Sequence, residues 1–284
     1  MLTRAELMRV YKEACEVELQ AFKPGNVSVY SAGHDMTVDD FRISASVSAE
    51  PITNPDFSLG ERIFYAVQAT RSAVACNTNL GIILLCAPLL LAAEKVADGK
   101  SLQECLNQVL ENTSRQDADW VFRAIVLASP GGLGESDRQD VRSPAAVTLT
   151  EAMALAAQRD RIALQYVNGF KDLFDFAVFR YNRAFVWSGE SSWAALAVFA
   201  ELLANYPDSH VERKYGEQYS EWIAAEMAEL LKTMEAANEP TEVLPLLQGI
   251  DKAFKAKNIN PGTSADLTVA TVLVVLLAKL VERC

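Results

Sequence analysis

Helix-start patterns recur along this chain, and they restrict its fold more than any other feature. A Ser or Thr followed three positions later by an acidic residue can cap a helix, because the two side chains accept hydrogen bonds from backbone N–H groups of the first turn. Three pairs fit this pattern and two are weaker versions: Thr3 with Glu6, Ser58 with Glu61, Ser101 with Glu104, Thr37 with Asp40, and Ser114 with Asp117. No Asn-Gly or Asp-Gly pair stands between two alternating runs, as a β-hairpin requires. The sequence therefore predicts an all-α bundle of about ten helices.

The long apolar segments favour the same fold class. Apolar residues between Ser58 and Ala75 recur at the spacing of a half-buried helix. The last segment, residues 269–281, is β-branched enough to form a strand if taken alone. Its length, and a Thr263-Ser264 cap followed by Asp266, make a central buried helix the better interpretation.

Length and segment lengths indicate one soluble domain. With 284 residues and no linker-like run of Pro, Ser or Gly, we expect a single domain over residues 1–284. Residues 80–93 and 267–278 are shorter than the roughly 20 apolar residues of a membrane helix. The first residues do not resemble a signal peptide. Five cysteines without a CxxC pair fit free thiols, so we expect a cytoplasmic protein.

The charge of the chain excludes one class of partner. A formal charge of −11 is unlike the basic stripe of a nucleic-acid-binding protein. We therefore expect no nucleic acid as a partner, and the short apolar segments predict no membrane. A polyphosphate substrate would need a local basic pocket or a divalent cation. An acidic, Ala-rich helical chain is also compatible with a homodimer.

Six polar islands rich in Gly, Asn, Asp, His and Lys interrupt the apolar segments. We expect the helix ends that carry them to converge on one polar cleft. The islands are residues 23–27, 33–36, 77–81, 130–140, 208–216 and 260–266.

The first two islands offer a cation, an amide and a histidine. A helix stop accounts for a Pro and a Gly after Lys23, which leaves Lys23 and Asn26 as candidates for a phosphate contact and an amide donor. His34 and Asp35 precede a predicted helix start, where the helix dipole favours anions. Asp35 is compatible with a plain turn, but beside His34 it favours proton transfer or cation binding.

The next two islands suggest ligand contacts. Asn77, Thr78 and Asn79 lie between apolar segments, where amides and hydroxyls are costly unless they bond one another, the backbone or a ligand. The glycine-rich segment at 130–134 is neither a Walker loop nor a dinucleotide loop. Asp137 and Asp140 follow it at a spacing at which both carboxylates could meet one Mg²⁺, and a solvated loop is the alternative.

The fifth island resembles a helix start with charges one turn later. Asp208 would cap this helix, and Arg213 and Lys214 could flank a phosphate. His210 is the second of only two histidines. An exposed charged helix face is the alternative for Lys214.

Taken in order, these islands resemble the triphosphoribosyl-dephospho-CoA synthase family. The shared features are Lys23-Pro24-Gly25, His34-Asp35-Met36 with Phe41 and Ser44, Thr70, Asn77-Thr78 with Gly81, and the later Asp208 and Gly216. The resemblance implies an all-α enzyme that condenses ATP with 3′-dephospho-CoA, releases adenine and makes a prosthetic-group precursor.

The resemblance supports these positions, and the chemistry of the implied reaction suggests a role for each of them. Mg²⁺ would be held by acidic residues, and the acid and base would be histidines. The metal candidates are Asp35, Asp137, Asp140 and Asp208, and the catalytic candidates are His34, Asp35 and His210. The nucleotide-binding candidates are Lys23, Asn26, Asn77, Thr78, Asn79, Arg213 and Lys214.

The chain departs from the family pattern in two places. Family members carry a His and a Lys where this chain has Asn79 and Leu80. A later Asp-Thr-Asn with a following His-Arg-Gly-Gly becomes Asp208-Ser209-His210 with Arg213-Lys214-Tyr215-Gly216. The chain thus looks like a divergent branch, similar to versions in methanogens and methylotrophs. Two further readings stay open: a related transferase with another acceptor in one-carbon coenzyme biosynthesis, and a non-catalytic helical binding protein.

Overall fold

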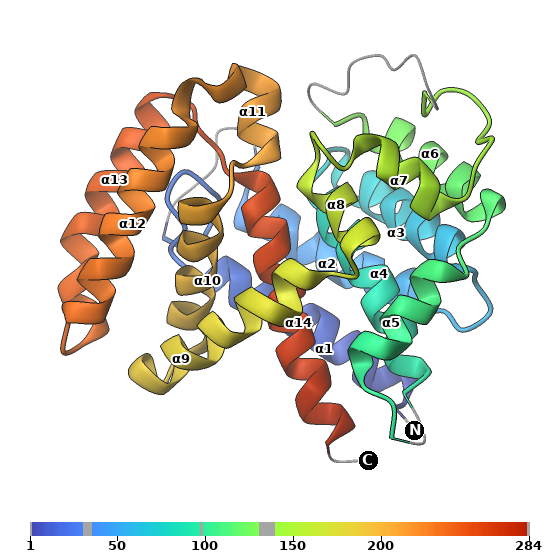
Figure 1. Cartoon of the computed structure of the whole chain (residues 1–284), viewed down its shortest axis with the longest axis horizontal. Helices are drawn as coiled ribbons and strands as arrows, with labels where there is room; N and C mark the ends of the chain where they lie inside the picture. Colours follow the sequence, from blue (N-terminus) through green and yellow to red (C-terminus); the bar gives the residue numbers. More distant parts are fainter. Residues whose placement is uncertain (1, 31–35, 97–98, 131–139, 283–284) are drawn as a thin grey trace. The chain divides into compact units, whose positions relative to one another are not determined.

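The computed structural model describes residues 2–30, 36–96, 99–130 and 140–282. These residues form α-helices and short helical turns and contain no β-strand, so the predicted all-α class is confirmed (Figure 1). The described helices run from α1 to α14, which is more than the ten or so predicted. The chain separates into two compact units, each assembled from several segments, and a single domain over residues 1–284 stays a prediction.

Unit 1 comprises Met1–Cys15, Asp39–Lys171 and Leu273–Cys284. Within it, α3 packs on α6 and α4, α4 also contacts α5 and α8, and α7 packs on α8. Helix α4 is apolar on nearly all sides and lies at the centre of this packing. The helices are α2 (Val38–Ile52), α3 (Leu59–Val74), α4 (Leu80–Glu94), α5 (Leu102–Glu111), α6 (Arg115–Ala128), α7 (Leu149–Ala156) and α8 (Arg161–Asn168).

Unit 2 comprises Glu16–Val38 and Asp172–Val272. Its centre is α10, whose middle is buried between α9 and α12, and α13 lies along α12 (Figure 1). The α-helices are α9 (Val178–Ser188), α10 (Ser191–Asn205), α11 (Ser209–Tyr215), α12 (Ser220–Ala236) and α13 (Leu244–Ala256). Short turns of other helix types are the π-helical Asp172–Ala177 and the 3₁₀ segments Gly216–Tyr219 and Pro240–Val243.

Helices α1 (Arg4–Gln20) and α14 (Gly262–Val281) are divided between the two units, and Val38, the first residue of α2, also belongs to unit 2. Helix α14 has 20 residues and is apolar enough to cross a membrane, so the expectation that no segment reaches this length is wrong. In its most apolar window, 72% is buried within the protein. That burial identifies α14 as the central buried helix that the sequence predicted.

Four of the predicted capping boxes are present, those that begin at Thr3, Ser58, Ser101 and Ser114. Ser58, Ser101 and Ser114 each cap their helix reciprocally with the acidic residue three positions later. Thr3 and Glu6 exchange the same bonds before α1. The predicted Thr263-Ser264 cap of α14 is wrong, because the helix already begins at Gly262, and the N–H and hydroxyl of Ser264 donate to the carboxylate of Asp208.

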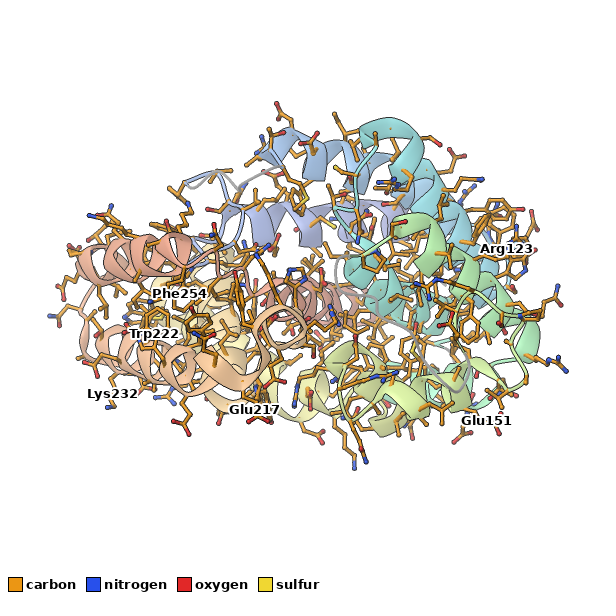
Figure 2. The ribbon with its side chains drawn as sticks, turned by 90° about the horizontal axis from the view of Figure 1, so that it is seen from above. Arg123, Glu151, Glu217, Trp222, Lys232 and Phe254 are labelled. Atoms are coloured by element: carbon orange, nitrogen blue, oxygen red, sulfur yellow. The ribbon has the colours of Figure 1, made fainter. Side chains whose placement is uncertain are left out.

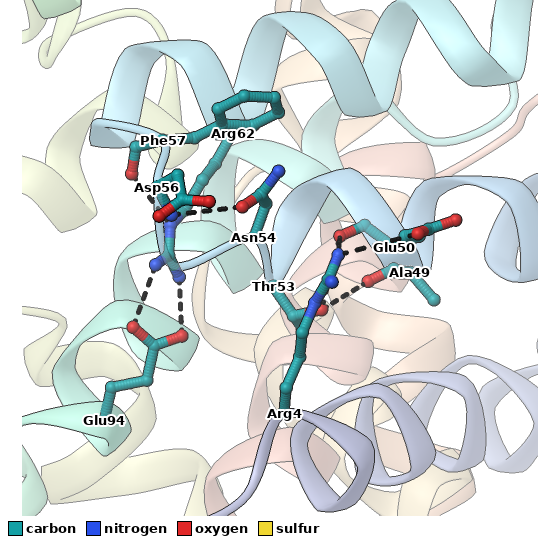
Figure 3. Close-up of polar contacts among 9 residues, drawn as sticks. All are labelled: Arg4, Ala49, Glu50, Thr53, Asn54, Asp56, Phe57, Arg62 and Glu94. Carbon is teal, nitrogen blue, oxygen red and sulfur yellow. Dashed lines mark hydrogen bonds and ion pairs between the residues drawn. The ribbon is translucent and has the colours of Figure 1, made fainter.

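A buried ion pair fixes the start of α3 in unit 1. The guanidinium of Arg62, only 1% exposed, donates to both carboxylate oxygens of Glu94 at 2.7 and 2.8 Å (Figure 3). Its Nε donates to the carbonyl oxygen of Phe57, in the loop before α3. Such a bidentate pair fixes geometry as well as charge, so it holds the 53–58 loop on α4.

Candidate functional site

In unit 1, the Asn77-Thr78-Asn79 island joins a buried hydroxyl network on α2. The hydroxyl of Thr78 donates to Ser44 Oγ at 2.6 Å, and Ser44 in turn donates to the carbonyl oxygen of Asp40. The Asn79 amide donates to Ser48 Oγ at 3.4 Å, and Ser48 also bonds the buried Tyr11 hydroxyl. These bonds satisfy much of the polar capacity that the sequence assigned to a ligand.

Asn77 and Thr70 complete the unit 1 cluster in different ways. The Asn77 side chain accepts the N–H of Leu80 and thereby helps to start α4. Thr70, on α3, is 2% exposed, and its hydroxyl has no hydrogen-bond partner among the residues the structure describes. Substrate contacts by Asn77, Thr78 and Asn79 stay predictions.

In unit 2, Lys23 is completely buried and stabilises its own loop. Its ammonium lies 2.9 Å from the carboxylate of Glu18 and donates to the carbonyl oxygens of Glu18, Ala21 and Val27. Burial lowers the pKa of Lys23 and raises that of Glu18, and their mutual attraction offsets only part of both shifts. This position assigns Lys23 to folding the loop, whereas the sequence suggested a phosphate contact.

The rest of this loop is held against the region around the end of α13. Gly25 has a φ of +76°, and a Cβ there would lie 2.4 Å from the carbonyl oxygen of Ile259, so only glycine fits without a shift. Its N–H donates to Asp251. The amide of Asn26, which is 8% exposed, donates to Asn260 Oδ1 at 2.8 Å. The first and sixth islands therefore meet in unit 2.

Asp208 caps two helices at once. Its Oδ1 accepts the N–H groups of His210 and Val211 at 2.9 and 3.1 Å, as the predicted cap of α11 should. Its Oδ2 accepts the N–H and hydroxyl of Ser264 at 2.8 and 2.9 Å, in the first turn of α14. Both oxygens are occupied by protein donors, which leaves the predicted metal role of Asp208 without support in its contacts.

His210 has a half-buried ring whose two nitrogens are not used in hydrogen bonds to the described residues. The ring lies against Gly262, where a Cβ would be 3.6 Å from its Cγ. Burial lowers the pKa of His210, the Asp208 carboxylate opposes this, and the nearby cations Arg213 and Lys214 reinforce it. Neither ring nitrogen has a hydrogen-bond partner in the described part of the chain. A neutral imidazole in this position can accept a proton at neutral pH.

Arg213 and Lys214 lie in the last turn of α11 and are exposed. The Lys214 ammonium donates to the carbonyl oxygen of Asn258 at 3.4 Å and lies 5.0 Å from the centre of the Tyr215 ring. Because Lys214 is four residues after His210 in the same helix, the two side chains lie on one face of α11. The predicted gathering of His210 with these cations is thus present within unit 2.

Several predicted site residues lie elsewhere. His34, Asp35 and Asp137 fall outside the residues the structure describes. Asp140 belongs to unit 1, where it accepts the N–H of Arg142 at 2.9 Å and pairs with its guanidinium at 3.2 Å. Across the described ranges, no three His, Cys, Asp or Glu residues are grouped as metal ligands.

Sequence reasoning missed two partners on which the unit 2 cluster depends. Glu18 lies within α1, and Asp251 lies within α13 as one of many exposed-looking helix acids. Nothing local distinguishes them. A signal was present only at Lys23, a lone charge flanked by apolar residues, because such a cation requires a buried carboxylate.

The fold and these two clusters define a class of protein. Polar residues from loops and helix ends are collected on an all-helical scaffold, and the described residues include no sheet that could carry a Rossmann or P-loop site. The family model of the ATP:dephospho-CoA triphosphoribosyl transferases matches residues 4–284. The chain belongs to this family and is a transferase.

A solved structure supports the fold. A protein from Archaeoglobus fulgidus, described as a "putative triphosphoribosyl-dephospho-coA synthase", superposes with a TM-score of 0.61. It is 24% identical, and the match covers 82% of this chain and 96% of that one. No curated protein matches this chain.

Proposed function

We propose that this chain transfers the 5′-triphosphoribosyl group of ATP to 3′-dephospho-CoA and releases adenine. The observation that carries the proposal is the family match, which extends over residues 4–284. The unit 2 cluster supports it, because a neutral histidine there lies on the same helix face as a cation.

The reaction forms one bond and breaks one. The 2′-hydroxyl oxygen of dephospho-CoA attacks C1′ of the ATP ribose, and the bond from C1′ to adenine N9 breaks with its electron pair passing to adenine. His210, kept neutral by burial, takes the hydroxyl proton, and adenine leaves as the neutral base after gaining one proton from solvent; His210 then returns its proton to solvent, so that the reaction has no net change in protons. Arg213 and Lys214 bind phosphate oxygens.

The requirement for Mg²⁺ rests on the charge of the triphosphate. A divalent cation neutralises adjacent phosphate oxygens, and hard oxygen ligands suit it. Among the predicted ligands, Asp208 and Asp140 already bind protein donors, and they do not fit a metal set as they stand. We therefore assign no protein ligand to Mg²⁺ and route no step through it.

A second acceptor is the main alternative. Asn79 and Leu80 replace the His and Lys of the family pattern, and they are only 5% and 8% exposed. Loss of a cation beside a polyphosphate or an acceptor changes which anions bind well. A related transferase acting in one-carbon coenzyme biosynthesis is compatible with this substitution.

The deciding experiment is incubation of the purified chain with ATP, Mg²⁺ and dephospho-CoA, followed by chromatography for adenine. We expect adenine in equal amount to the dephospho-CoA consumed, loss of product with EDTA, and a rate lowered by about 10²-fold or more in His210→Gln. Lys232→Gln is the matched control, since Lys232 is an exposed residue on α12 that pairs only with Glu229 among the described ion pairs.

Other outcomes distinguish the alternatives. Adenine formation with a pterin or furan acceptor, but not with dephospho-CoA, would support the second acceptor. ATP binding without adenine release with any acceptor would support a non-catalytic binding protein and would refute the proposed transfer.

A further inference from the structure

A row of aromatic rings crosses unit 2 from the end of α11 to α13. The ring of Tyr215 lies 5.3 Å from that of Tyr219, at 80°, and Tyr219 lies 6.3 Å from Trp222. Trp222 meets Phe254 at 5.3 Å and 60°, and Figure 2 shows these two side chains together between α12 and α13. Phe254 is fully buried, whereas the other three rings are partly exposed. The row is therefore anchored in the core at one end and open to solvent at the other.

Two lysines lie over this row. The Lys257 ammonium is 5.7 Å from the centre of the Tyr219 ring and 5.6 Å from that of Trp222. The Lys214 ammonium is 5.0 Å from the Tyr215 ring. We call Tyr215, Tyr219, Trp222, Lys214 and Lys257 the aromatic–lysine ridge.

Hydrogen bonds fix the ridge before any ligand arrives. The Tyr215 hydroxyl lies 3.2 and 2.9 Å from the carbonyl oxygens of Lys257 and Asn258, at the end of α13. The Trp222 indole N–H donates to Glu226 at 2.9 Å. These bonds connect α11 to the end of α13 and hold Tyr215 and Trp222 in place, so these two rings lose little side-chain freedom on binding.

The lysines of the ridge are unusual in so acidic a chain. Acidic residues outnumber Lys and Arg by 37 to 26, yet neither Lys214 nor Lys257 has a carboxylate within 4.0 Å among the described residues. The nearby acids are engaged or exposed: Glu212 accepts from Ser220, Glu226 accepts from Trp222, and Glu217 faces solvent. Half-buried rings beside ammonium groups that have no carboxylate partner can stack a base and hold its phosphates.

We propose that the aromatic–lysine ridge binds the acceptor nucleotide, with its adenine stacked on Tyr219 and its diphosphate on Lys214 and Lys257. This inference rests on the proposed function, from which the identity of the acceptor is taken. His210 is one helical turn before Lys214 on the same face of α11. A base that takes the proton of the acceptor's 2′-hydroxyl must lie beside the acceptor's ribose. We therefore assign the ridge to the acceptor, and separate KM values for the two substrates test this assignment against ATP.

The test is calorimetry of the full chain with dephospho-CoA alone and with ADP as a minimal probe. We expect Tyr219→Leu to weaken both by about tenfold, since stacking on one aromatic side chain contributes on that scale, and Tyr219→Phe to retain binding. Lys257→Gln and Lys214→Gln should each weaken binding several-fold, while the control Lys232→Gln should not. In turnover, these variants should raise the KM for dephospho-CoA and leave the KM for ATP and kcat near the wild-type values.

The outcomes separate the ridge from the overall reaction. Unchanged dissociation constants in the folded variants, equal weakening of ATP and dephospho-CoA, or no binding of either probe to the wild-type chain would each overturn the inference. Binding of ADP that is lost in Tyr219→Leu, with no adenine formed from ATP, would support the ridge as a nucleotide site while the proposed transfer fails.

Discussion

Replacing Asp208 by Ala should destabilise unit 2 more than the loss of any ordinary helix cap. The carboxylate accepts three backbone N–H groups and one hydroxyl, and these donors belong to the first turns of two different helices. Loss of one cap costs about 1 kcal/mol, within a range of about 0.5–2. Loss of both therefore costs about 2 kcal/mol, within a range of about 1–4, and should lower the Tm by about 2–7 °C for a chain of this length.

The assay is thermal unfolding followed by far-UV circular dichroism, with two comparison variants. Asp160→Ala removes the cap of one helix, α8, where Asp160 accepts the N–H groups of Ile162 and Ala163, and the loss of that cap should cost about 1 kcal/mol. Asp208→Asn keeps an acceptor for α11 but turns an amide donor towards Ser264. Its loss of stability should therefore lie between those of Asp160→Ala and Asp208→Ala.

A Tm shift in Asp208→Ala no larger than that of Asp160→Ala would refute this double-cap reasoning. The metal role predicted from the sequence has a different consequence. If Asp208 binds Mg²⁺, its replacement by Ala should also raise the Mg²⁺ concentration needed for activity, whereas loss of the two caps alone should leave that concentration unchanged.

Three further predictions concern unit 2. Burial lowers the pKa of His210, so folding favours its neutral form. The stability that this histidine contributes is complete above its unfolded pKa of about 6.5 and is lost as pH falls through the folded pKa. On going to about pH 5, the Tm of His210→Gln should therefore fall less than that of the wild type. Lys23→Met should lower the free energy of unfolding in urea by about 3–5 kcal/mol, because it leaves Glu18 buried and unpaired. The double variant with Glu18→Gln should recover much of this loss. A double variant as unstable as Lys23→Met would contradict the reasoning. Gly25→Ala should lower the stability by about 1–3 kcal/mol more than Gly189→Ala. Gly189 has a similar φ of +70°, but no atom lies within 4 Å of a Cβ added there. Equal Tm shifts in the two variants would count against the close contact of Gly25 with the Ile259 carbonyl oxygen.

The sequence predicts the fold class well where the physics is local. The capping boxes at Thr3, Ser58, Ser101 and Ser114 need only two residues three positions apart, and they formed as predicted. Helix number was underestimated because α7, α8 and α11 have only 8, 8 and 7 residues. Apolar periodicity becomes visible only over windows of about 11–18 residues.

The site was less predictable because its partners are distant in sequence. The bonds of Asp208 to Ser264 span 56 residues, and those of Asn26 to Asn260 span 234. The cap on α11 was predictable from Asp208 alone, but its second oxygen's partner was not. Lys23 has a close partner in sequence, yet helical periodicity does not show that the chain folds back on Glu18.

The polar islands thus stabilise the fold, because many of their side chains are hydrogen-bonded to other protein groups. In the described residues, Lys23, Asp208, Thr78 and Asn79 are bonded mainly to protein groups, so their substitution would alter the scaffold as well as any chemistry. A loss of activity in such variants would not by itself identify a substrate contact.

Function is tested more directly by substituting residues whose polar atoms make few hydrogen bonds to other protein groups. The ring nitrogens of His210 and the ammonium of Lys257 have no hydrogen-bond partner within the described ranges, and Lys214 has only one long bond. All three lie in unit 2, around α11 and the end of α13. Because changing them disturbs few protein contacts, kinetic effects of His210→Gln, Lys214→Gln and Lys257→Gln would report on the substrates themselves, and intact turnover in all three would place the chemistry outside this cluster.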